Sequence, residues 1–259
     1  MISAPNLAAG AACAVPSVSA AAANVASTIG IEAIYSGTVL ALAVLASTLA
    51  ASCPASLANG LDTPTSARQL ITVEAKVART TYAELRTWRK RGPCWVAVAG
   101  PYTVRLGRSG LSSNRREGDG TTPTGTYRIG RTMYGNEPNP GVRFAYRRLR
   151  CGDWWDEDPR SPTYNSFQHV ACGTAPPFAG GSEGMWQQPL PYPFLAVIEY
   201  NMRPVVPGRG SGIFLHAQTG GPTIGCISLR KPELRAVLRW LHPAGAPVIA
   251  IGTRKQLRG

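Results

Sequence analysis

One short stretch of the chain, residues 212–229, pairs a candidate nucleophile with a candidate base. His216 ends an apolar run, and Cys226 follows ten positions later across a Gly-Gly-Pro loop that we expect to turn the chain back. A cysteine thiolate is a strong nucleophile at neutral pH when a nearby base takes the thiol proton. Gly225 would let the backbone approach a substrate closely and leave amide N–H groups free to face a developing oxyanion. The pairing therefore predicts an acyl-transfer site built on Cys226 and His216.

A purely structural interpretation of both residues remains open at this point. Cys226 has the apolar neighbours Ile224 and Ile227 and could be a small buried hydrophobic residue. A histidine at the end of a strand is often a hydrogen-bonded core residue. Short Cys/His spacings also arise by chance, so spacing alone does not decide between structure and catalysis.

Two motifs resemble those of the L,D-transpeptidases with a YkuD-type catalytic domain. His216 followed by Thr223-x-Gly225-Cys226-Ile227 is similar to the family signature, in which a histidine precedes a Ser/Thr-x-Gly-Cys segment that carries the nucleophile. Upstream, the segment 118–127 (GDGTTPTGTY) looks like the Thr-Pro-x-Gly segment of the family. The likeness extends from about residue 68 to residue 253.

The chain departs from the family pattern near the cysteine. Many members have histidine directly before Gly-Cys and arginine or asparagine shortly after it, whereas this chain has Ile224 and Ser228. The spacing from His216 to Cys226 is also shorter than in many members. The run Gly-Gly-Pro-Thr-x-Gly-Cys is closer to that of a secreted actinobacterial branch.

The resemblance implies a cysteine acyltransferase that acts on peptidoglycan stem peptides through a thioester on Cys226. The backbone N–H of Cys226, with a neighbouring amide around Gly225, would hold the oxyanion. Thr223 would have a positioning role, and the carbonyl of Ala217 would orient the imidazole of His216. The resemblance implies neither a metal nor an organic cofactor, and it leaves cross-linking and carboxypeptidase outcomes open. The alternatives are a non-catalytic wall-binding protein that keeps the fold and, less favoured, a cysteine hydrolase with unrelated substrates.

The chain after the first 67 residues reads as mainly β. Gly92-Pro93 and Gly100-Pro101 are expected turns, and one amphipathic helix is expected from Pro232 to Leu241. We expect one sandwich-like or barrel-like domain with one or two short helices over residues 68–259, and the resemblance implies the YkuD-type β-fold. The expected strands are Leu70–Val73, Tyr82–Trp88, Cys94–Val98, Tyr102–Leu106, Tyr127–Ile129, Phe194–Tyr200, Ile213–His216, Cys226–Leu229 and Pro247–Ile251.

Periodicity is lost between Met133 and Pro193, where proline, glycine, asparagine and aromatic residues dominate. A stretch of this length without regular structure is often a lid or a binding loop. We expect it to overhang the site, with Trp154 and Trp155 stacking on a sugar or peptide and neighbouring acids holding a substrate amine. One tryptophan in the core and acids that only face water is the structural alternative.

Residues 1–67 contain no Lys or Arg and are rich in alanine, which indicates a leader rather than a domain. The uncharged run 38–51 is too short to span a bilayer but suits the apolar region of a secretory signal. Three outcomes stay open: secretion with cleavage after Ala58, lipid anchoring through Cys53, and a retained membrane-associated leader. Each places the protein outside the cytoplasm, at the cell wall or beyond.

All 27 Lys and Arg residues lie after residue 67, against 12 of the 14 acidic residues. The basic residues are scattered and no nucleic-acid motif accompanies them, so nucleic acid is not an expected partner. Anionic cell-wall polymers fit an exported basic domain better, although such charges can also serve only solubility. We expect a monomer.

Four cysteines follow the leader, in a compartment that should be oxidising. With Cys226 kept as a free thiol, Cys151 and Cys172 are the best candidates for a disulfide, because they flank the irregular stretch. Cys94 would then be a buried hydrophobic residue. No Cys/His spacing matches a zinc site, so His169 and His242 are given structural roles.

Overall fold

The computed structural model describes residues 52–179 and 181–258, which lie in one compact unit. The predicted signal segment 38–51 lies outside the described residues. Residues 52–67, however, are folded onto the domain: Leu57 and Ala58 are buried, and Ala58 joins a cluster that includes Trp95. The expected boundary at residue 68 is therefore wrong, because apolar side chains upstream of it are part of the core.

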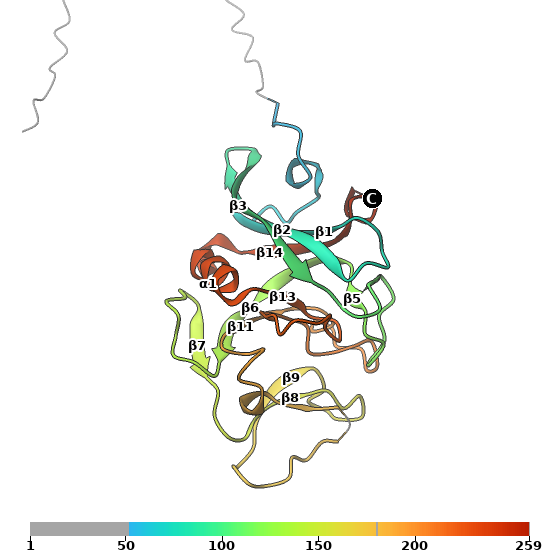
Figure 1. Ribbon diagram of the computed structural model, residues 1–259, viewed down its shortest axis with the longest axis vertical. Helices are drawn as coiled ribbons and strands as arrows, with labels where there is room; N and C mark the ends of the chain where they lie inside the picture. Colours follow the sequence, from blue (N-terminus) through green and yellow to red (C-terminus); the bar gives the residue numbers. More distant parts are fainter. Residues whose placement is uncertain (1–51, 180, 259) are drawn as a thin grey trace, which may run out of the picture. The chain divides into compact units, whose positions relative to one another are not determined.

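A nine-stranded sheet forms most of the domain (Figure 1). Its order is β11-β12-β13-β3-β2-β1-β14-β6-β7, and β11 also pairs with β6. That additional pairing closes eight of the strands into a ring, with β7 attached at its edge. The predicted mainly β, barrel-like fold is confirmed. The strands are β1 (Gln69–Ala75), β2 (Tyr82–Arg91), β3 (Cys94–Arg105), β6 (Gly125–Gly135), β7 (Ala145–Arg148), β11 (Leu195–Ile198), β12 (Phe214–Ala217), β13 (Ile227–Leu229) and β14 (Val248–Thr253).

The remaining elements are short. A three-stranded sheet has the order β10-β8-β9, and β4 pairs with β5. Among the described residues, no helix is long and apolar enough to cross a membrane. These elements are β4 (Leu111–Ser112), β5 (Thr122–Pro123), β8 (Asp153–Asp156), β9 (Ser166–His169), β10 (Glu183–Gly184), α1 (Lys231–Trp240), α2 (Arg254–Arg258), and the 3-10 helices η1 (Ala58–Gly60), η2 (Met185–Gln187) and η3 (Pro243–Gly245).

Strand β1 lies near the middle of the sheet and buries both of its faces. Ile71 and Val73 belong to the main core, whereas Leu70 packs on the other side with Trp88 and Trp95. Because each face is covered, β1 reads as an almost continuous apolar run rather than as a strict alternation.

Helix α1 covers the strands that carry the candidate site. Its buried residues Leu234, Val237 and Leu238 recur at helical spacing, and Pro232 lies in its first turn, where the missing N–H is tolerated. Its contacts are with β12 and β13. The helix therefore supports the back of the strands on which His216 and Cys226 are placed.

Two connections differ from the sequence-based expectation. Gly100-Pro101 is not a turn, because β3 runs through it and shifts its register against β2 there. Strands β12 and β13 run parallel, so the Gly-Gly-Pro loop is a crossover and does not turn the chain back. The loop is anchored on a third segment, since Thr223 N donates to Leu106 O at 2.9 Å and Arg108 N donates to Thr223 O at 2.8 Å.

The stretch from Met133 to Pro193 is more ordered than its composition indicates. It contributes part of β6, all of β7 to β10, and η2. The Cys151–Cys172 disulfide, the predicted pair, joins the residues that border β8 and β9. Figure 1 shows β8 and β9 at the end of the domain opposite the hairpin of β2 and β3.

The second disulfide was not predicted. Cys53 is bonded to Cys94, so Cys94 is not a buried unpaired residue. A sulfur held in this bridge cannot carry a lipid, and cleavage after Ala58 would remove Cys53 altogether. Lipid anchoring through Cys53 and cleavage after Ala58 would each require a chain without this bridge, and both stay predictions.

Candidate active site

His216 and Cys226 line one cavity of about 740 Å³. The cavity lies between the strands β12 and β13 and the small sheet, since residues of β8, β10 and η2 also line it. Pairing of the parallel strands places His216 opposite Ser228 and Leu215 opposite Ile227. Cys226, directly before β13, is thereby brought to the beginning of β12.

Cys226 is the free cysteine of the described residues, and its sulfur is hydrogen-bonded to backbone groups of the adjacent segment 212–214. The thiol donates to Gly212 O at 3.2 Å, and Phe214 N donates to Cys226 Sγ at 3.3 Å. Burial raises the pKa of the Cys226 thiol to about 12, although the Phe214 N–H favours the thiolate. The resting side chain is therefore a neutral thiol at pH 7.

His216 is oriented by a backbone carbonyl, as predicted for Ala217: the distance from Nδ1 to Ala217 O is 2.8 Å. A carbonyl oxygen can only accept, so Nδ1 carries the proton and the neutral ring keeps its lone pair on Nε2. Burial lowers the pKa of His216 to about 4, although the backbone carbonyls of Ala217 and Pro191 favour the protonated ring. The resting imidazole is therefore neutral, with Nε2 able to accept a proton.

Thr223 closes the turn that carries the nucleophile. Its hydroxyl donates to Cys226 O at 2.7 Å and accepts from Gly225 N at 3.1 Å. The amide of Gly225 is consequently occupied, which contradicts the expectation that it is free for an oxyanion. Gly225 has a φ of 140°, and a Cβ there would meet Arg115 Nη1 at 2.5 Å, so only glycine fits.

Arg115 holds the nucleophile turn from the other side and was missed by the sequence analysis. It is 3% exposed, pairs with Asp119 at 3.3 Å and donates to the carbonyls of Thr121 and Ile224. One side chain thus ties the Thr-Pro-x-Gly motif to the Gly-Cys motif. Nothing in its local sequence separates it from the scattered surface arginines.

Three glutamates also line the cavity: Glu117, Glu157 and Glu183. Burial together with the nearby carboxylates of Glu183 and Glu117 raises the pKa of Glu157 to about 8. Burial also raises the pKa of Glu183, although the Tyr192 hydroxyl opposes this by donating to it at 2.7 Å. Glu157 belongs to the acidic group that was expected near a substrate, whereas Glu183 had no sequence signal.

The two tryptophans that were predicted to bind substrate lie in different environments. Trp154 lines the cavity and contacts Trp186 edge to face, with ring centroids 5.0 Å apart. Trp155 is 2% exposed and packs edge to face on Phe214, so it is a core residue and cannot stack on a substrate. The alternation of side chains along β8 explains this, because neighbours on a strand point to opposite faces.

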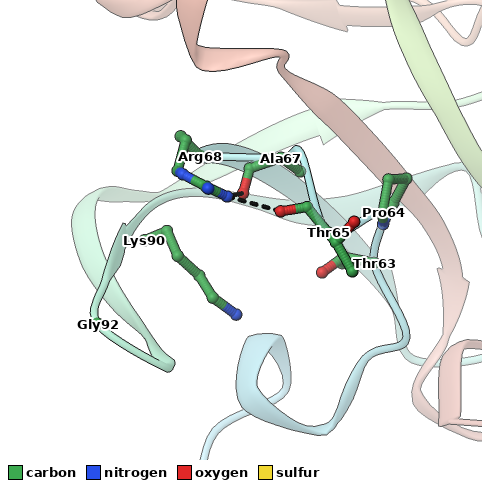
Figure 2. A pocket seen from close by; sticks show the side chains of 7 residues that line it. All are labelled: Thr63, Pro64, Thr65, Ala67, Arg68, Lys90 and Gly92. Atoms are coloured by element: carbon green, nitrogen blue, oxygen red, sulfur yellow. Dashed lines mark hydrogen bonds between the residues drawn. The ribbon is translucent and has the colours of Figure 1, made fainter.

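A second pocket, of about 530 Å³, lies between the N-terminal segment and the hairpin of β2 and β3 (Figure 2). Arg68 there donates to Thr65 O at 2.6 Å and to Ala67 O at 3.2 Å. Its lining holds threonine, proline, arginine and lysine but no cysteine, histidine or acidic residue. The Cys/His pair makes the cavity at Cys226 the candidate active site.

Comparison with known proteins identifies a family for this chain. A family model described as the L,D-transpeptidase catalytic domain matches residues 69–249, which is more than half of the chain and includes both motifs. No curated protein and no solved structure matches the chain. Among the described residues, no group of three or more His, Cys, Asp or Glu side chains is placed to hold a metal ion. The chain belongs to the L,D-transpeptidase catalytic-domain (YkuD) family.

Proposed function

We propose that the protein is an L,D-transpeptidase that acts on peptidoglycan stem peptides through a thioester on Cys226. One observation carries the proposal: a free cysteine lines the same cavity as a neutral histidine whose Nδ1 is fixed by the Ala217 carbonyl. Such a pair needs no permanent charge at rest, because the base can take the proton as the substrate arrives.

The reaction would proceed in two halves. His216 Nε2 takes the proton of Cys226 Sγ, and the sulfur attacks the carbonyl carbon at an L-to-D junction of a tetrapeptide stem. The Cys226 N–H donates to the oxyanion that develops. The imidazolium then gives its proton to the amine of the departing D-alanine, and the carbonyl re-forms as a thioester.

The thioester is resolved by a second nucleophile. An amine of another stem attacks the carbonyl carbon, His216 takes the amine proton and passes it to the departing sulfur, and a cross-link results. Water in place of the amine gives a carboxypeptidase product and the same free thiol. The roles of Thr223 and Arg115 in both halves are to hold the turn on which Cys226 sits.

We also propose that the protein is exported to the cell wall or beyond. Disulfides at Cys53–Cys94 and Cys151–Cys172 favour an oxidising compartment. The excess of basic residues suits contact with anionic wall polymers. A tether through the leader would involve residues outside the described ones.

The alternative is a non-catalytic wall-binding protein, and one observation favours it. Cys226 Sγ donates to Gly212 O, and no hydrogen bond joins it to His216 among the described residues. On this alternative the thiol would be a permanent part of the protein interior.

A covalent adduct distinguishes the two functions. The purified protein is incubated with a carbapenem, which the family membership leads us to expect as an acylating agent, and its intact mass is measured. Our proposal expects a stoichiometric adduct on Cys226, none in Cys226→Ala, and an adduct formed about 10²–10⁴-fold more slowly in His216→Ala. A protein with reduced Cys226 and no adduct would support the wall-binding alternative.

A further inference from the structure

The cavity beside Cys226 gathers acidic side chains, in contrast to the basic composition of the chain as a whole. The chain carries 27 basic and 14 acidic residues. The lining of the cavity nevertheless contains the three glutamates Glu117, Glu157 and Glu183 with Arg115 as its basic residue. A concentration of carboxylates against the overall charge requires an explanation, because like charges in a confined space raise the free energy of the ionised site.

Two of these acidic groups have few partners among the described residues. The Glu157 carboxyl group makes no hydrogen bond or ion pair to any described residue, and Glu183 accepts only from the Tyr192 hydroxyl at 2.7 Å. The positive charge of Arg115 lowers the pKa of Glu157 in part, but the hydrogen bonds of its guanidinium go to Asp119 and two backbone carbonyls. Glu117 differs from the other two glutamates, because it accepts from Tyr164 and Ser211 and so has a structural role.

The unpaired carboxylate lies next to the reacting sulfur. A Cβ built on Gly212 would meet Glu157 Oε1 at 2.0 Å, so the carboxylate rests against this glycine. The carbonyl of the same glycine accepts from Cys226 Sγ at 3.2 Å. Gly212 therefore lies between the Glu157 carboxyl group and the Cys226 sulfur, so a group bound by Glu157 would be close to the nucleophile. Trp154 forms an aromatic wall of the same cavity.

A second observation, independent of the acids, also indicates a polar ligand. Ser228 is 1% exposed, its Oγ has no hydrogen-bond partner among the described residues, and it lines this cavity. Its pairing with His216 on parallel strands directs both side chains to the same face. A buried hydroxyl without a partner is costly, and a ligand in the cavity would supply one.

We propose that Glu157 and Glu183 form a subsite for a primary ammonium group of a peptide substrate, with Trp154 as its aromatic wall and the Ser228 hydroxyl as a further polar contact. The inference deepens the proposed function and rests on it for the choice of peptide. Two carboxylates and a hydroxyl match the three donors of an ammonium group. The subsite thus selects peptides that carry a free amine near the acylated carbonyl.

The first test requires no enzymatic activity. At about pH 9, above the raised pKa of Glu157, Cys226 is modified with cationic 2-(trimethylammonio)ethyl and anionic 2-sulfonatoethyl methanethiosulfonates, and the Cys226 peptide is quantified by mass spectrometry. The rates are normalised to those of N-acetylcysteine. We expect a cation preference of about tenfold or more, lost in the double variant Glu157→Gln/Glu183→Gln and kept in Glu84→Gln, which removes an exposed charge on β2. An equal preference in all three proteins, or no reaction at Cys226 with either reagent, would overturn the subsite.

The second test separates the subsite from the proposed function. Binding of a tetrapeptide with a free lysine amine and of its Nε-acetyl analogue is measured by calorimetry on Cys226→Ala, with and without Glu157→Gln. We expect the free amine to bind about tenfold more tightly, and only when Glu157 is present. Equal binding of the two peptides by Cys226→Ala, while the parent protein with Cys226 still forms the acyl-enzyme, would refute the subsite alone. A selective protein that never forms acyl-enzyme would refute the proposed function alone.

Discussion

His216 and Cys226 are both neutral at pH 7 in the resting protein, because burial works against the charged form of each. The pKa of His216 is lowered to about 4 and that of Cys226 is raised to about 12. A preformed thiolate–imidazolium pair would require the reverse order of these two pKa values. The geometry instead favours a thiol that is activated only when a substrate carbonyl is present.

The neutral state of His216 has a consequence for stability. Its pKa in the folded protein lies below the unfolded value of about 6.5, so the unfolded chain binds the proton more readily. The corresponding stability is present above pH 6.5 and is lost as the pH falls toward 4, by on the order of 3 kcal/mol in total. His216→Gln should remove this loss, because its amide can still donate to Ala217 O and cannot take up a proton.

Urea unfolding of the parent and of His216→Gln between pH 7 and pH 4 measures this difference. Carboxylates and the other two histidines contribute equally to both proteins, so they cancel in the comparison. Parallel stability curves would mean that His216 is not buried as a neutral ring.

At the scale of elements, the two sequence motifs are joined through Arg115. The guanidinium spans from the Thr121 carbonyl beside β5 to the Ile224 carbonyl before β13. Arg115→Lys keeps the charge but loses the planar fork, so at least one of these carbonyls loses its donor. We expect acylation of Cys226 to slow by about tenfold or more, and the protein to lose about 1–3 kcal/mol of stability.

The matched control is Arg116→Lys, because Arg116 is the exposed neighbour of Arg115. Acylation rates by intact mass and unfolding midpoints are compared for the two variants. If Arg115→Lys and Arg116→Lys behave alike, Arg115 does not hold the nucleophile turn.

The Cys151–Cys172 bridge stabilises the small sheet more than the barrel. It borders β8, which carries Trp154 and leads into Glu157, whereas the main core lies on other strands. Replacing both cysteines by alanine should remove about 3 kcal/mol by the chain-entropy relation. Hydrogen exchange should accelerate in residues 153–169 and stay slow in β1 and β14, and a uniform acceleration would show that the bridge serves the whole domain.

The elements that could be predicted are those whose signal is local. The helix at Pro232 follows from its helical periodicity, the strands β1 and β14 follow from their apolar runs, and the Cys/His pair follows from its motif. The parallel pairing of β12 and β13 could not be predicted, because β13 has three residues and its partner is chosen by long-range packing. Glu183 and Arg115 were missed for the same reason, since burial and partners define their roles.

At the scale of the whole molecule, the domain combines a basic chain with an acidic cavity. A basic exterior suits attraction to anionic wall polymers, and this long-range attraction weakens as salt is added. The carboxylates at Cys226 act over a few ångströms and are partly shielded from solvent. Binding to the polymer and selection of the peptide should therefore respond differently to ionic strength.

The segment before β1 is held to the domain by a covalent bond and by apolar contacts. The Cys53–Cys94 bridge joins it to the start of β3, and Leu57 and Ala58 are buried. A chain that begins at Asn59 loses the bridge, these apolar contacts and the partner of Cys94. By the chain-entropy relation the bridge alone contributes on the order of 3–4 kcal/mol, so this shorter form should unfold at a clearly lower temperature than one that begins at Ser52. Intact mass of the exported protein supplies the complementary measurement, because export should yield a chain that retains Cys53 in a disulfide. Recovery of a stable, active chain that begins at Asn59 would show that the segment is dispensable.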